Sequence, residues 1–74
     1  MIERRFPYVA AWVRHHGRLE VGYHEFSVSF IRAHDPGGTV WEGASDYPTL
    51  DDAFAAADEG LAGWLRRMGI PRIP

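Results

Sequence analysis

The apolar positions in the first part of the chain alternate as they do in β-strands. Between Arg5 and Arg14, large side chains at Phe6, Tyr8 and Trp12 alternate with smaller apolar ones, and no helical period fits them well. Pro7 is tolerated only at a sheet edge or in the first residues of a strand. The pattern therefore predicts an edge strand over Arg5 to Arg14.

Two further strands are predicted after a break in this pattern. The segment His16-Gly17-Arg18 has the composition of a three-residue hairpin loop. A long strand is expected from Leu19 to His34, and Gly22 offers a place for it to bend or bulge. Asp35-Pro36-Gly37-Gly38 has the residue chemistry of a turn. A short third strand is expected from Thr39 to Ala44.

The second half of the chain has the three-and-four spacing of an amphipathic helix. Thr49 can cap its N-terminus, Arg66 and Arg67 complement the dipole at its other end, and Gly69 can terminate it. We interpret four acids as electrostatic stabilisers of this helix: Asp51, Asp52, Asp58 and Glu59. The apolar stripe consists of Leu50, Phe54, Ala57, Leu61, Trp64, Leu65 and Met68.

These elements predict a single α+β domain over residues 1–74. Short turns favour a three-stranded antiparallel meander, with one C-terminal helix packed on one sheet face (βββα) and a short extended tail over residues 70–74. A hairpin loop at residues 16–18 sets the register of the first two strands. The expected cross-strand pairs, which would form the helix-facing core with Phe30, are Phe6 with Val28, Tyr8 with Phe26, Ala10 with His24, and Trp12 with Gly22.

The opposite sheet face is unusually apolar in this register. It would carry Val9, Ala11, Val13, Val21, Tyr23 and Ile31. A contiguous apolar face favours contact with another chain, although scattered apolar surface residues are the alternative, and a register slip of one residue would exchange the two faces. The interface expected for a homo-oligomer or a protein partner is Val9, Ala11, Val13, Tyr23, Ile31 and Trp41.

Composition narrows the functional classes. At 74 residues the chain is too short for a two-domain enzyme or a full dinucleotide-binding fold. Its 46% hydrophobic content is typical of a folded protein. It has no cysteine, its net charge is -2, and it contains no apolar run long enough to cross a membrane. The first residues lack the apolar stretch of a signal peptide, so we expect a cytoplasmic protein without a membrane partner.

No motif in the sequence indicates catalysis or a cofactor. His15, His16, His24 and His34 lack metal-binding spacing, and the serines lack a nucleophile motif. We therefore expect a protein that is not an enzyme and binds no metal or cofactor.

Nucleic-acid binding remains the alternative. Arg14, His15, His16 and Arg18 form a compact basic cluster, and Tyr23 and Trp41 could stack on bases. The ten acidic residues of the chain oppose such binding.

The second part of the chain resembles the N-terminal domain of HicB-like antitoxins. The resemblance covers residues 26–74 and consists of the strand Phe26-Ser27-Val28-Ser29-Phe30, the turn at Pro36-Gly37, a strand ending at Gly43, the helix start Thr49-Leu50-Asp51-Asp52-Ala53 and the ending Gly69-Ile70-Pro71-Arg72-Ile73-Pro74. The Cys often found after the turn glycine is absent, and there are extra residues between Gly43 and Thr49. The resemblance implies an oligomeric domain that binds a toxin-like protein partner. The leading hypothesis is a self-associating protein-interaction module.

Overall fold

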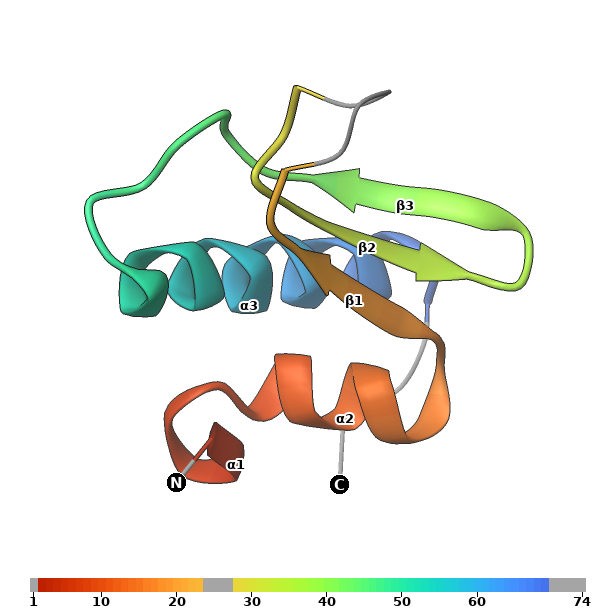
Figure 1. Cartoon of the computed structure of the whole chain (residues 1–74). Coiled ribbons are helices and arrows are strands. Elements are labelled where there is room, and N and C mark those ends of the chain that lie inside the picture. The colour runs from red at the N-terminus through yellow and green to blue at the C-terminus, as the bar shows by residue number, and fades with distance from the viewer. Residues whose placement is uncertain (1, 24–27, 70–74) are drawn as a thin grey trace.

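The computed structural model describes residues 2–23 and 28–69. Figure 1 shows the order of its elements: α1 (Ile2–Arg5), α2 (Pro7–His15), β1 (Arg18–Val21), β2 (Ile31–Asp35), β3 (Gly38–Glu42) and α3 (Leu50–Arg67). The strands form an antiparallel sheet in the order β1-β2-β3, and a helix follows them. The predicted fold class, an α+β meander with a C-terminal helix, is confirmed, and two helices precede the meander.

The C-terminal helix α3 begins and ends at the residues that its sequence predicts. Thr49 has an extended backbone, and its Oγ1 accepts a hydrogen bond from the Asp52 amide at 3.1 Å. Gly69 follows the C-cap with a φ of 72°, a conformation that glycine adopts without a Cβ penalty. Of the predicted apolar stripe, only the two ends, Leu50 and Met68, are largely exposed.

The predicted first strand is wrong, because residues 7–15 form the helix α2. Pro7 stands in the first turn, where its missing amide costs nothing. The next two amides, of Tyr8 and Val9, donate to Asp58 Oδ1 of α3 at 2.7 and 3.0 Å. Asp58 therefore caps a helix 50 residues away from it in sequence, rather than only stabilising its own.

The predicted long second strand is also wrong, because two shorter strands, β1 and β2, replace it and pair with each other. Gly22, with a φ of 115°, follows β1, and its amide donates to the Phe30 carbonyl at 2.7 Å. The observed register pairs Arg18 with His34 and Val21 with Ile31, which replaces the predicted pairs. Of the residues in the predicted pairs, Val28 is 83% exposed and thus outside the core, while Phe26 and His24 lie outside the described residues.

The last strand and the turn before it match the prediction closely. The strand predicted over residues 39–44 is β3, which spans Gly38–Glu42. Pro36 and Gly37 form a tight turn, in which Asp35 Oδ1 accepts a hydrogen bond from the Gly37 amide at 2.8 Å.

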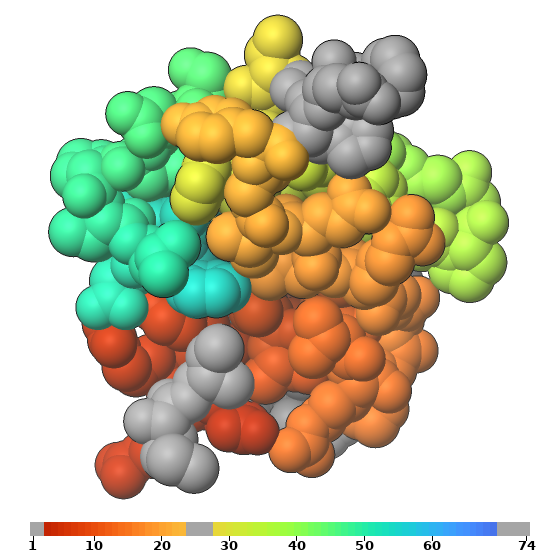
Figure 2. All heavy atoms as spheres, in the orientation of Figure 1, coloured from red at the N-terminus to blue at the C-terminus, as the bar shows by residue number. Residues whose placement is uncertain are grey.

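Both α2 and α3 cover the same sheet face. The core between them contains Phe6, Val9, Trp12, Ile31, Ala33, Ala53, Ala57, Leu61 and Leu65. Trp12 is fully buried, meets Trp64 edge to face at 5.3 Å, and donates from Nε1 to the Arg18 carbonyl. On the face shown in Figure 2, β1 and α2 (orange) cover much of α3. No helix within the described residues has the length and apolarity needed to cross a membrane.

This arrangement removes the apolar sheet face expected from the sequence. Val9, Ala11 and Val13 lie on α2, so they cannot share a sheet face with Tyr23 and Ile31. Buried side chains account for three of the six expected interface residues, namely Val9, Ala11 and Ile31. Val13 and Tyr23 are exposed at 49% and 70%, and Trp41 is half-buried.

Candidate functional site

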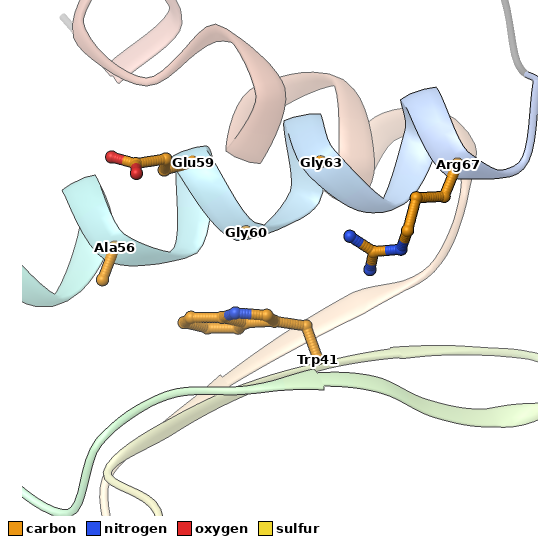
Figure 3. Close-up of a pocket in the computed structure, with 6 residues that line it drawn as sticks. All are labelled: Trp41, Ala56, Glu59, Gly60, Gly63 and Arg67. Atoms are coloured by element: carbon orange, nitrogen blue, oxygen red, sulfur yellow. The ribbon is translucent and has the colours of Figure 1, made fainter.

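A groove runs between α3 and β3 and has a volume of about 420 Å³. Figure 3 shows its lining: Trp41 from β3 faces a stripe of α3 that consists of Ala56, Glu59, Gly60, Gly63 and Arg67. The α3 residues recur at three- and four-residue spacing, which places them on one side of the helix. The groove is therefore a surface of small residues bordered by one aromatic ring and two charges.

The close approach of Trp41 to Gly60 shapes this groove. A Cβ at Gly60 would collide with the indole of Trp41, which explains the glycine in the middle of a helix. Gly60 thus lets β3 and α3 lie near each other, while Gly63, one turn further along, leaves the groove open. Trp41 is the one expected interface residue that lines this groove.

The two charged side chains of the groove lie on either side of Gly63. Glu59 points away from the indole, whereas Arg67 reaches back along α3 towards it (Figure 3). Arg67 Nη1 lies 3.4 Å from the position that a Cβ on Gly63 would occupy. Within residues 2–23 and 28–69, neither Glu59 nor Arg67 forms an ion pair, in contrast to Arg5, Arg14, Arg18 and Arg32. The groove therefore presents one charge of each sign without an ion-pair partner in the part of the chain that the structure describes.

Sequence reasoning missed this groove, although a signal was present. Ala56, Gly60 and Gly63 are small residues at helical spacing, next to the predicted apolar stripe of the same helix. Glycine in a helix interior lowers helix stability by about 1 kcal/mol relative to alanine, so two such glycines indicate that another group approaches the helix backbone closely. The identity of the approaching group, Trp41, depended on the fold.

The outer sheet face carries a polar network centred on Glu20. Its Oε1 accepts from Arg32 Nε at 3.1 Å and contacts His34 Nε2 at 3.0 Å, and Arg18 lies 3.5 Å from Oε2. Hydrogen bonding from His34 lowers the pKa of Glu20 against the opposing effect of desolvation, and the Arg32 hydrogen bond and the Arg18 charge reinforce the shift. The Arg32 side chain is only 6% exposed and also donates to the carbonyls of Gly22 and Ser29.

The same network contains a relay of acid, imidazole and hydroxyl groups. Thr39 Oγ1 lies 2.9 Å from His34 Nδ1, so the tautomer with a proton on Nε2 donates to Glu20 and accepts from Thr39. In a catalytic triad the acid accepts a hydrogen bond from the histidine and orients it, but here Glu20 also neutralises Arg32 and Arg18. The network lines neither the groove between α3 and β3 nor a smaller cavity along α2. We interpret the network as a structural connection among the three strands.

The basic cluster expected to contact nucleic acid is largely neutralised by nearby acids. Arg14 pairs with Glu3 at 2.9 Å, and Arg18 contacts Glu20 at 3.5 Å. His16 stacks on Trp12 with a centroid separation of 5.3 Å, and only His15 is both exposed and without such a contact. Both guanidinium charges of the cluster therefore face carboxylates.

Two other surfaces are less distinctive. Tyr23, Phe30 and Tyr47 form an aromatic cluster, with ring centroids 5.3 and 6.5 Å apart, that ties the connection after β1 to the one after β3. A smaller cavity of about 260 Å³ lies along α2 and is bordered by the ion pair between Glu3 and Arg14. A hydrogen bond from its own backbone amide lowers the pKa of the Glu3 carboxyl, and the Arg14 side chain lowers it further.

The histidines are spread over the molecule. His15 and His16 end α2, His34 lies in β2, and His24 is outside the described residues. Among residues 2–23 and 28–69, no three His, Asp or Glu side chains are grouped so that they could hold a metal ion.

Comparison of the chain with protein-family models, with curated proteins and with solved structures finds no match.

Proposed function

We propose that this chain is a non-enzymatic protein-interaction module whose docking surface is the groove between α3 and β3. The observation that carries the proposal is the combination of a half-buried indole, a helix stripe of small residues and two charges without ion-pair partners among the described residues. Aromatic rings and arginine are enriched at protein interfaces, and small residues let a partner backbone approach closely. Self-association, expected from the sequence, is retained in this proposal, but through a different surface.

A toxin-like partner is a further part of this proposal. It rests on the resemblance of residues 26–74 to HicB-like antitoxins. The turn at Pro36-Gly37 and the capped helix of that resemblance are present, whereas Val28, Ser29 and Phe30, expected in its first strand, lie in the connection before β2. In such a role, the groove would receive a partner protein.

The test compares two variants of α3, one inside the groove and one outside its lining. Gly63→Leu fills the groove, whereas Ala55→Leu adds the same side chain at an exposed position outside the groove lining. Tagged wild type and both variants are used to capture partners, including untagged copies of the chain, from extract of the native host with and without nuclease treatment. Each captured partner is then purified and its affinity for the three proteins is measured.

We expect Gly63→Leu to lose binding and Ala55→Leu to keep it, with both variants folded by circular dichroism. Equal binding by all three proteins would show that the groove is not the docking surface. Binding that disappears after nuclease treatment would favour the nucleic-acid alternative.

A further inference from the structure

The charges of the groove are arranged symmetrically along α3. Residue 63 lies midway between 59 and 67, so Glu59 and Arg67 are each four residues from Gly63, on opposite sides. At about 1.5 Å rise per residue, each charge lies about 6 Å along the helix axis from Gly63. If a second α3 crosses antiparallel at Gly63, each Glu59 comes opposite the Arg67 of the other helix. Two reciprocal ion pairs would then flank the crossing point.

We propose that the occupant of the groove is a second copy of this chain, bound through an antiparallel contact of α3 with α3 around a two-fold axis at Gly63. The inference rests on the proposed function, since it names the partner for the same groove. A two-fold interface must be self-complementary, and a helix with an acid and a base equidistant from a glycine meets this condition. A parallel contact in register would instead bring identical charges together.

The side chains of the groove fit this geometry. Gly63 has no side chain, so the two helices can approach closely at the crossing point. Arg67 reaches into the groove from its own helix, and its flexible end can turn to the carboxylate of Glu59 in the second copy. Trp41 borders the crossing and would be covered by the second helix, which removes its exposed apolar surface from water.

Disulfide trapping tests this geometry directly, because the chain has no cysteine of its own. Helix axes about 8–10 Å apart place the two Cα atoms at a crossing point about 3.5–5.5 Å apart, which overlaps the range of about 4.4–6.8 Å for disulfides. Gly63→Cys should therefore form a covalent dimer on mild oxidation. Two copies of Glu59→Cys, or two of Arg67→Cys, place their cysteines about 12 Å apart along the axis and should not. A mixture of Glu59→Cys with Arg67→Cys should form the mixed dimer.

Charge reversal gives a second measurement that needs no cysteine. Glu59→Arg or Arg67→Glu alone places like charges opposite each other at both ion-pair positions. Each variant should raise the dimer dissociation constant, measured by sedimentation equilibrium, at least about tenfold. The double variant restores opposite charges and should recover the wild-type dissociation constant. Arg4→Glu, an equal charge change on α1, is the control and should leave it unchanged.

The outcomes separate this inference from the proposed function. Folded Gly63→Cys that stays monomeric, or trapping of equal yield at positions 63, 59 and 67, would overturn the two-fold contact. Failure of the double charge reversal to restore association would overturn it as well. If Gly63→Leu still abolishes binding of another protein in that case, the groove remains a docking surface and only its occupant is different. If Gly63→Leu changes no interaction, both proposals fail.

Discussion

The carboxylate of Asp58 should contribute more to stability than any other acid on α3. It receives the amides of Tyr8 and Val9 at 2.7 and 3.0 Å, and these are the first two amides of α2, because Pro7 has none. The N-cap residue of α2, Phe6, supplies no side-chain acceptor. Asp58→Ala therefore leaves both amides without their acceptor, at the end of a helix whose first buried residue is Val9.

The size of the effect follows from these contacts. Hydrogen bonds to a charged group contribute about 1.5–3 kcal/mol net, a lost N-cap costs about 0.5–2 kcal/mol, and these terms overlap because one oxygen serves both amides. We expect Asp58→Ala to reduce the free energy of unfolding by about 2–3 kcal/mol. For a domain of this size, that lowers the melting temperature by roughly 10–20 °C.

Urea and thermal unfolding, followed by circular dichroism, measure this change. Asp51→Ala is the matched control, because Asp51 is also an aspartate of α3 but its ion pair with Arg5 is more than half exposed. The control should cost less than about 1 kcal/mol, from the exposed pair and the helix dipole. Amide hydrogen exchange gives a local readout, since Tyr8 and Val9 should lose protection beyond the global change. Equal stability of Asp58→Ala and wild type would refute the cross-helix cap.

Three further predictions concern the polar groups of the sheet and of the α2 terminus. Arg32→Met should destabilise the fold by about 2–4 kcal/mol in urea unfolding, because it removes a buried cation bound to two carbonyls. Arg18→Met, at an exposed position beside the same Glu20, should change stability by less than about 1 kcal/mol, and similar losses in the two variants would contradict this account. Folding lowers the pKa of Glu20 below its ordinary 4.5, so the stabilising effect of the Glu20 carboxylate is complete above pH 4.5 and is lost as the pH falls through the native pKa. Urea midpoints measured in steps below pH 4.5 should therefore fall less steeply in Glu20→Gln than in wild type. Parallel curves for the two proteins would exclude the shift. Arg14→Ala combined with Arg18→Ala should leave any binding to single-stranded RNA and its salt dependence unchanged, since both charges already face glutamates. A drop of about 0.7 in the salt slope per lost contact would favour RNA binding over the protein-interaction hypothesis.

Local residue chemistry was sufficient to predict the second half of the fold. Thr49 caps α3 through its own hydroxyl, Gly69 ends it with a positive φ, and the Pro36-Gly37 turn sets β3 beside β2. Each of these signals acts within a few residues, so tertiary context is not needed to interpret them. The class of fold could be predicted for the same reason.

The first half could not be predicted, because residues far away in sequence decided its structure. Residues 5–14 have strand-like composition, yet Phe6, Val9 and Trp12 also fit one side of a helix, and packing against α3 selects that alternative. Asp58 supplies the N-terminal cap that α2 lacks in its own sequence, and that contact exists only after α2 and α3 have come together.

The candidate site shows the same division. The sequence by itself determined that α3 is amphipathic, that small residues lie beside its apolar stripe, and that Glu59 and Arg67 are equidistant from Gly63. Only the tertiary structure placed Trp41 against Gly60 and left Gly63 open beside it. It also moved the apolar residues expected at the interface, Val9 and Ile31, into the core. Helix periodicity is a property of neighbouring residues, whereas a groove depends on the packing of two elements that the chain brings together from separate segments.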